Sequence, residues 1–405
     1  MWRDLRVTRR SGDAANALQV ADAGINDAIK SVRNAVPVVG ACPQYPALAG
    51  FTRTASLASG AYTYCAAETQ DSTGRSVWYI DATGTDATGV ERRVRSEAVA
   101  EPLFPNAINV IASGSFSSGF SVDSYKDEVN RCTKKGVIGT NSPSTFSFGN
   151  NGLNSSDNCQ NNPNGTFPHP PDGCVAYSIN GTATIPASKT GSGQCPPATT
   201  TTASPEFSMA TPDPPTTYDY PASGQSNANF SCTQPNLVAG KTYFYNAVTL
   251  GVGCGFPAAG PHPSMASPTI IYTTALTIAG GNGNSVTNAI NPPPNSSAVC
   301  GATHGAAGAN AWYCPGWPGA LQIYVIGNGT VTFSGNHSVF WGVIKAPSGS
   351  ATWSGGGGAQ YEIFGSMVAQ SVSGGVQAKW HYDENLGGLT TGRFFGRNWR
   401  EEPLQ

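Results

Sequence analysis

Charged side chains are scarce in this sequence of 405 residues, since only 11% are Asp, Glu, Lys or Arg and the net charge is −2. Globular proteins carry roughly 25% charged residues. Binding to nucleic-acid phosphates needs clustered positive charge, which this balance does not provide. The hydrophobic content of 39% is too high for a disordered chain. We therefore expect a folded protein that binds no nucleic acid.

Sequence motifs for catalysis and for metal binding are also missing. The five His residues show no HxH or HExxH spacing, which zinc-dependent hydrolases require. Glycoside hydrolysis needs two carboxylates on either side of one bond. The close acidic pair Asp383-Glu384 fits this poorly, because neighbouring residues of a strand point to opposite faces. We predict a non-enzymatic protein without cofactor or metal; a polysaccharide-active β-helix enzyme is the least favoured alternative.

The chain contains ten Cys residues but no CxxC pair. An even number of scattered Cys residues favours disulfides over a metal site. The disulfide candidates are Cys42, Cys65, Cys132, Cys159, Cys174, Cys195, Cys232, Cys254, Cys300 and Cys314. Because disulfides persist outside the reducing cytoplasm, we predict an exported, extracellular protein.

No apolar run of signal-peptide or membrane-span length stands among Met1 to Arg10. An exported chain needs such a segment. Either the chain is a soluble form that lacks this segment, or the true start lies upstream. Contact with a membrane is expected only through an upstream span that is absent from the chain as written.

Residues 4–35 show a long helical pattern. Apolar or small residues recur every three or four positions, which places them in one stripe along a helix. This helix stripe consists of Ala14, Leu18, Ala21, Ile25, Ala28 and Val32. Small residues allow close packing, either against helices of other subunits or on the protein's own domain. Pro37 ends the pattern, so we assign residues 1–36 to an N-terminal amphipathic helix.

Residues 37–103 predict a small antiparallel β unit, because short apolar-alternating segments flank turn residues. The expected strands are 62–67, 77–81 and 91–98. Cys42 and Cys65 are expected to form a disulfide that closes the loop between the helix and the sheet.

Residues 104–400 contain short apolar pieces separated by Gly, Ser and Asn, with almost no helical pattern. This texture is typical of an all-β solenoid or sandwich. Asn-, Thr- and Pro-rich stretches interrupt the segment from about 141 to 265, which we interpret as a loop insert. The chain as a whole is predicted to be mainly β.

The segment between Cys300 and Cys314 could bind a metal with His304, but a disulfide that closes a small loop is the favoured interpretation. Three aromatic residues lie in this loop or follow it: Trp312, Tyr313 and Trp317. Such residues could stack on sugar rings or anchor a partner. Alternatively, they cap the end of the β domain.

The helix contains ALQVADAGI at 17–25, and the β unit contains WYIDATG at 78–84, followed by ERRV at 91–94. These segments resemble PilX-type, type IV pilin-like proteins, in which similar segments follow the membrane span. Pieces of the C-terminal part, such as FWGVIKA at 340–346, resemble a β-helix-like domain of many such proteins. RNWRE at 397–401 is similar to the tail of that domain.

The resemblance implies a right-handed β-helix or solenoid-like C-terminal domain and a structural role as a minor pilin-like subunit of a bacterial type IV pilus or related surface filament. The helix stripe would then pack against other pilin-like subunits. The alternative is a surface adhesin whose β domain binds a surface glycan or a host or cell-surface protein. The leader, cleavage site and apolar span of the family are absent from the chain as written, so the resemblance implies that the span was deleted or mis-assigned and that Met1 is a non-native start.

Overall fold

The computed structural model describes part of the chain, and the statements below concern this part. The described residues are 2–33, 41–70, 76–116, 121–125, 137–139, 144–148, 176–178, 181–184, 213–220, 229–232, 238, 240–251, 268–280, 289–290, 318–335, 337–355, 360–374, 377–388 and 390–403. They form two compact units, the first from Met1–Leu103 with Gly387–Gln405, the second from Phe104–Leu386.

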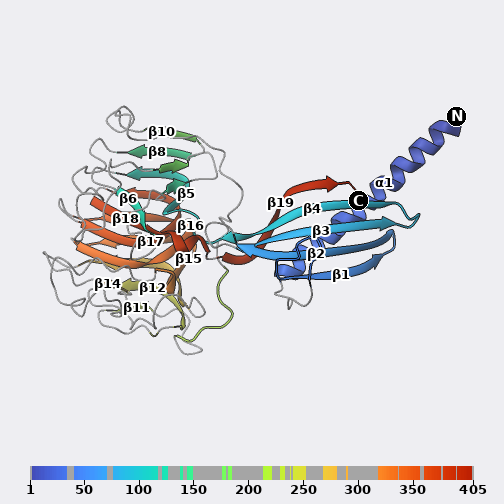
Figure 1. Ribbon diagram of the computed structural model, residues 1–405. Helices are drawn as coiled ribbons and strands as arrows, with labels where there is room; N and C mark the ends of the chain where they lie inside the picture. Colours follow the sequence, from blue (N-terminus) through green and yellow to red (C-terminus); the bar gives the residue numbers. More distant parts are fainter. Residues whose placement is uncertain are drawn as a thin grey trace. The chain divides into compact units, whose positions relative to one another are not determined.

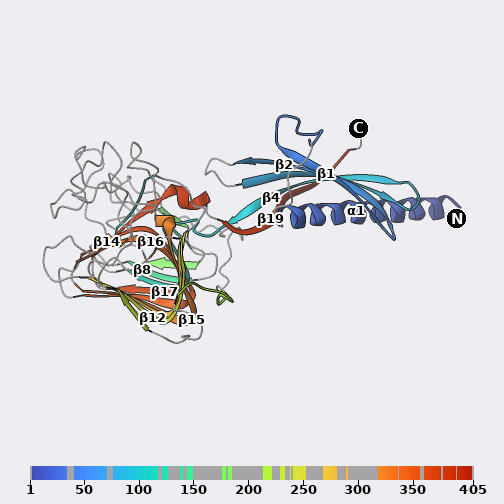
Figure 2. The same ribbon diagram turned by 90° about the horizontal axis from the view of Figure 1, so that it is seen from below.

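The first unit consists of one helix, α1 (Trp2–Arg33), and a five-stranded antiparallel sheet. The strand order is β1 (Gly50–Leu57), β2 (Gly60–Gln70), β3 (Ser76–Asp86), β4 (Glu91–Pro102) and β19 (Thr390–Glu402). Helix α1 lies along one face of this sheet, and its first turns extend past the end of the strands (Figures 1 and 2).

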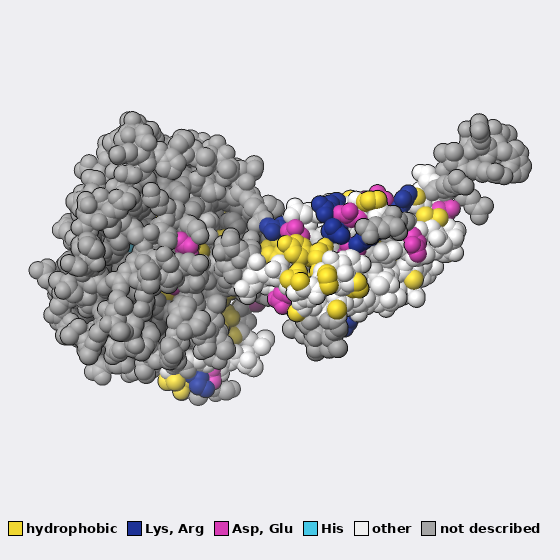
Figure 3. Space-filling model, in the orientation of Figure 1, with side chains coloured by type: hydrophobic (Ala, Val, Ile, Leu, Met, Phe, Trp, Pro, Cys, Tyr) yellow, Lys and Arg dark blue, Asp and Glu magenta, His cyan; other side chains and the backbone are white. Residues whose placement is uncertain are grey.

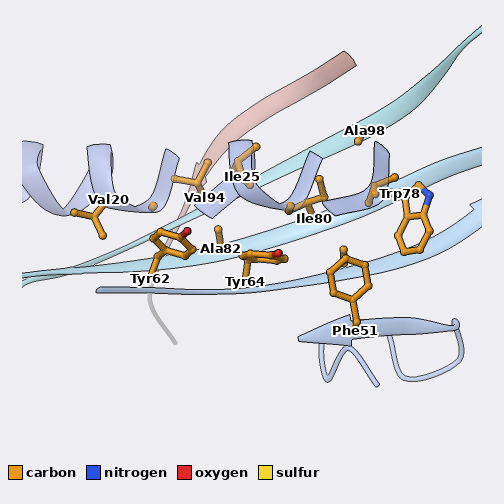
Figure 4. Close-up of a cluster of buried hydrophobic side chains, with 14 residues drawn as sticks. Val20, Ile25, Phe51, Tyr62, Tyr64, Trp78, Ile80, Ala82, Val94 and Ala98 are labelled. Carbon is orange, nitrogen blue, oxygen red and sulfur yellow. The ribbon is translucent and has the colours of Figure 1, made fainter. Parts of the chain in front are cut away.

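The core of the first unit forms because the helical period of α1 and the two-residue period of the strands bring apolar side chains to the same layer. Every second residue of β2, β3 and β4 points toward α1, as the pleat of a strand requires. The helix presents its small and apolar residues at the same place (Figure 4). The buried core residues are Val20, Ala21, Ile25, Ala28, Val32, Phe51, Tyr62, Tyr64, Ala66, Trp78, Ile80, Ala82, Val94 and Ala98.

The C-terminal strand differs from the expectation from sequence. We assigned residues up to 400 to the C-terminal domain, but β19 pairs with β4 in the antiparallel sheet. Strand β1 is also additional, and it pairs with β2 over its whole length. The chain therefore returns to the first unit after completing the second.

The second unit is built from parallel strand pairs. Its elements are β5 (Ile108–Phe116), β6 (Ser121–Tyr125), β7 (Val137–Gly139), β8 (Ser144–Phe148), β9 (Ala176–Ser178), β10 (Gly181–Thr184), β11 (Asn229–Cys232), β12 (Thr242–Leu250), β13 (Thr269–Ala279), β14 (Ala289–Ile290), η1 (Pro318–Ala320), β15 (Leu321–Ser334), β16 (His337–Ser354), β17 (Gln360–Gly374), β18 (Gln377–Asp383) and η2 (Glu384–Gly388). Strand segments between 141 and 265, such as β8 and β12, lie within the region interpreted as a loop insert.

The main strand order is β10-β8-β5-β17-β16-β15-β13-β12-β11. From β5 the chain adds β8 and then β10 in one direction. The next described strand, β11, stands at the opposite end, and the chain then runs back until β17 pairs with β5. Neighbouring strands lie about 4.8 Å apart, so β10 and β11 are separated by roughly 38 Å along the stacking direction.

Aromatic side chains fill the interior between these strands. Phe333 of β15 stacks on Trp353 of β16 with ring centroids 5.2 Å apart, and Trp380 of β18 meets both rings edge-on. The indole Nε1 of Trp380 donates to the carbonyl oxygen of Gly365 at 3.0 Å, which satisfies this buried polar group.

The predicted class, mainly β with one N-terminal helix and an antiparallel β unit, is confirmed. In the described part of the chain, no helix has the length and apolar composition needed to cross a membrane.

Candidate functional site

At the seam between α1 and β3, the helix backbone lies very close to the sheet. A Cβ atom added to Gly84 would lie 2.8 Å from the carbonyl carbon of Val20, and closer still to Ala21 N and Ala17 O. Only glycine at 84, facing alanines at 17 and 21, permits this approach. Thus ALQVADAGI and WYIDATG, two of the segments that carry the resemblance, are direct packing partners.

Further along the helix, a polar contact fixes its register on the sheet. The hydroxyl groups of Ser31 and Tyr64 share a hydrogen bond of 3.0 Å, and Arg53 Nη1 donates to Ser31 Oγ at 3.3 Å. Both Ser31 and Tyr64 are buried. Burial raises the pKa of the Tyr64 hydroxyl, which therefore stays protonated and able to donate.

The structure corrects one part of the prediction for the helix stripe. We considered two partners for the stripe, helices of other subunits and the protein's own domain. In the structure, the antiparallel sheet of the same unit covers most of the stripe. Ala21, Ile25, Ala28 and Val32 are at most 7% exposed. Leu18 is partly buried against the same core, and Ala14 is partly exposed. Those four residues are not available to helices of other subunits while this fold is intact.

The opposite face of the helix is largely polar. Its exposed residues are Ser11, Gly12, Ala15, Asn16, Gln19, Asn26, Lys30 and Arg33. Contacts of α1 with another chain would therefore use this polar face or the turns that precede the sheet.

Strand β19 closes the first unit by reaching the helix. Trp399 is 47% exposed, and its Nε1 donates to Asp22 Oδ1 of α1 at 2.7 Å. Asn398 has a φ of 55°, at an irregularity in the pairing with β4 that falls between Arg397 and Arg400. Arg397 Nε donates to Glu97 Oε2 at 2.9 Å. The RNWRE segment thus ties the C-terminal end of the chain to α1 and β4.

The sheet face away from α1 carries a buried carboxylate with two arginines. Arg93 donates to both oxygens of Asp81, at 2.7 and 2.8 Å, and Arg95 adds two bonds to Oδ2. The guanidinium of Arg95 also lies 5.7 Å from the ring centre of Tyr45. Basic and acidic side chains alternate on this face (Figure 3). These four bonds tie Asp81 of β3 to two arginines of β4 and hold the two strands together.

The expected disulfide between Cys42 and Cys65 is present, with Cα atoms 5.2 Å apart. Both residues are buried beside Ala67, with Tyr45 and Leu48 packed against them. The bond fixes the segment after α1 onto β2.

The acidic pair considered for catalysis lies at the end of β18. Asp383 is 2% exposed and ends the strand, while Glu384 begins η2 and is partly exposed. His381 is 1% exposed, and its ring stacks on Phe364 with centroids 4.6 Å apart. Among the described residues, no group of His, Cys, Asp and Glu could hold a metal ion.

Several predicted site residues lie outside the described residues: Cys132, Cys159, Cys174, Cys195, Cys254, Cys300, Cys314, Trp312, Tyr313 and Trp317. Cys232 ends β11, and its side chain also falls outside the description. Sequence reasoning did not single out Gly84, Asp22 or Trp399, although all three lie inside the segments that carry the resemblance.

Comparison with known families gives one match. Residues 302–389 are similar to a domain of unknown function, DUF7305, and this segment contains β15 to β18. The match covers less than a quarter of the chain. No curated protein and no solved structure matches the chain.

Proposed function

We propose that the protein is a non-enzymatic, minor pilin-like subunit of a bacterial type IV pilus or related surface filament. The observation that carries this proposal is the first unit: a 32-residue helix lies on an antiparallel sheet and extends past it. The segments that resemble PilX-type proteins meet there, through Gly84 against Ala17 and Ala21.

In this proposal the first unit attaches the protein and the second unit is displayed. The chain enters the second unit after β4 and leaves it before β19, so both connections start from adjacent strands of one sheet. The disulfide Cys42–Cys65 suits an oxidising, extracellular location.

We also propose that the second unit is a right-handed β-helix or a related solenoid. Each long strand contains an irregularity in its pairing register, and it pairs in parallel with the same neighbouring strands before and after that irregularity. These irregularities align across the sheet, at Thr273/Ala275, Tyr324/Thr330, Ala346/Ser350 and Ala369/Ser371. Aligned bends in successive strands are what a solenoid corner requires.

Photocrosslinking in cells that assemble the filament tests the attachment. A photoreactive amino acid replaces Asn16, on the exposed side of α1, or Thr54, which is exposed on β1 as the matched control. The proposal predicts crosslinks from position 16 to other filament subunits and far fewer from position 54. Equal crosslinking from both positions would argue against attachment through the helix.

A further inference from the structure

Four aromatic rings gather where the parallel sheet ends at β11 and β12. We call Tyr220, Phe230, Tyr243 and Tyr245 the end platform. Tyr220 stacks on Tyr243 and Phe230 stacks on Tyr245, each pair with centroids 5.0 Å apart and planes inclined by 17° and 22°. Tyr243 and Tyr245 are inclined by only 27° to each other. Tyr220 and Phe230 therefore form an outer layer, each stacked on one ring of the inner layer, and Phe230 is also inclined by 42° to Tyr243.

The outer layer is open to solvent, whereas the inner layer is not. Tyr243 and Tyr245 are 2% and 9% exposed, but Tyr220 is 40% exposed and Phe230 is partly exposed. Because Tyr243 covers one face of the Tyr220 ring, the exposed area of Tyr220 lies on its other face and its edge. Stacked rings on adjacent strands also occur in the core of this unit, as between Phe333 and Trp353, but there both rings are buried, whereas Tyr220 is exposed.

Hydrogen bonds hold the platform in place before any ligand arrives. Tyr220 N donates to Thr242 O at 3.1 Å, and Phe244 N donates to Tyr220 O at 2.7 Å. The hydroxyl of Tyr243 accepts from Val238 N at 2.7 Å. A ring fixed in this way loses little conformational entropy on binding.

A polar pair borders the platform. Lys241 Nζ donates to Asp219 Oδ1 at 3.1 Å, and Thr242 N donates to Asp219 Oδ2 at 2.8 Å. The bond from Thr242 N, followed by that from Lys241, lowers the pKa of Asp219, so the carboxylate stays charged. The side chains of Lys241 and Asp219 are 43% and 40% exposed. Figure 3 shows hydrophobic, basic and acidic side chains together at this end of the second unit.

We propose that the end platform binds a neutral oligosaccharide. The C–H face of a pyranose ring is flat and apolar and can stack on the exposed ring of Tyr220, with Phe230 as a second apolar contact. Lys241 can donate to the sugar hydroxyls, and Asp219 can accept from them. A mutually neutralised pair favours an uncharged ligand over an acidic or basic one. Small-ligand sites combine an apolar surface with a few fixed polar groups in this way.

This site consists of other residues than the aromatic ones considered in the sequence, and it does not depend on filament assembly. A second protein copy is a less suitable occupant, since a stable interface needs about 800 Å² from each partner and the described platform consists of two outer rings. Oligosaccharide binding can therefore fail or succeed independently of the pilin-like role.

A glycan array, followed by calorimetric titration of the bound glycans, tests the site in the full chain. We expect neutral oligosaccharides to bind. Tyr220→Ala should weaken binding about five- to tenfold, the effect of losing one aromatic contact. Tyr220→Phe keeps the ring and should bind within about twofold of the parent, which separates stacking from misfolding. Trp399→Ala removes an equally exposed ring elsewhere and should leave binding unchanged.

Two results would overturn the proposal. One is an array without any neutral glycan bound above background. The other is a bound glycan whose affinity Tyr220→Ala does not change. If Tyr220→Ala instead abolishes self-association measured by sedimentation, with no glycan bound, the platform is an interface between copies and the oligosaccharide assignment is wrong.

Discussion

Replacing Gly84 by Ala places one methyl group into a close contact between α1 and the sheet. The new Cβ would lie 2.8 Å from the carbonyl carbon of Val20, and nearer still to backbone atoms of Ala17 and Ala21. These neighbours belong to a helix backbone and cannot rotate aside as a side chain can. The helix must therefore shift away from β3, and this shift disturbs the packing of the buried helix residues that follow.

Overpacking of this kind typically costs 1–3 kcal/mol, and we expect Gly84→Ala to lie at about 2–3 kcal/mol because backbone must move. Hydrogen exchange followed by mass spectrometry separates the first unit from the second. A loss of about 2–3 kcal/mol corresponds to roughly 30- to 150-fold faster exchange of the most protected amides in α1 and β3. Amides of β15 to β17 should keep their exchange rates.

Gly12→Ala is the matched control, because it is the same substitution in α1 and a Cβ there meets nothing within 4 Å. Alanine favours the helix by about 1 kcal/mol relative to glycine, so this variant should exchange no faster than the parent. If Gly84→Ala exchanged at the parent rate in α1 and β3, the close seam would not exist, and the packing argument for the first unit would be refuted.

Three further predictions concern other contacts. Trp399→Phe keeps a ring but removes the bond to Asp22, so chemical unfolding of the first unit should show a loss of about 0.5–1.5 kcal/mol. A larger loss in the control variant Asp13→Asn, which leaves this bond intact, would contradict the assignment. Replacing Cys42 and Cys65 by Ser opens a cross-link between residues 23 apart and should cost about 3 kcal/mol in unfolding experiments; parent stability under oxidising conditions would exclude a stabilising disulfide. Burial raises the pKa of Tyr361 to about 12 from its ordinary value of 10.0. Its neutral form is favoured in the folded state, so its contribution is complete below about pH 10 and falls as pH rises toward about 12; Tyr361→Phe should show a shallower alkaline decline in unfolding midpoint, and an identical decline would remove this role.

The sequence predicted helices and strands correctly where the apolar residues recur with a single period. The helix stripe placed α1 correctly because its apolar residues recur at a single helical spacing. Strands β2, β3 and β4 were found because alternate residues such as Tyr62, Tyr64 and Ala66 are buried while the opposite face is mixed. The Cys42–Cys65 pairing was expected because Cys42 follows the helix and Cys65 lies in the first expected strand, so that a disulfide closes the loop between them.

Features that depend on distant pairing could not be read in this way. Strand β19 is interrupted at Arg397/Arg400 and is largely exposed there, so its sequence shows little alternation. Its bond from Trp399 to Asp22 joins residues 377 positions apart. The order of strands in the second unit follows from pairing of β17 with β5, and no local pattern encodes that choice. The end platform was missed because Tyr220 lies in a Pro-rich stretch that was interpreted as loop.

The pilin-like role is tested most directly by the composition of surface filaments. Filaments are sheared from cells that encode the protein, purified and analysed by quantitative mass spectrometry, with a deletion strain as the background. We predict that peptides from both units, for example from β3 and from β16, occur in the filament fraction in equal amounts. Finding the chain only in the cell-associated fraction, with assembled filaments free of it, would contradict the proposed role.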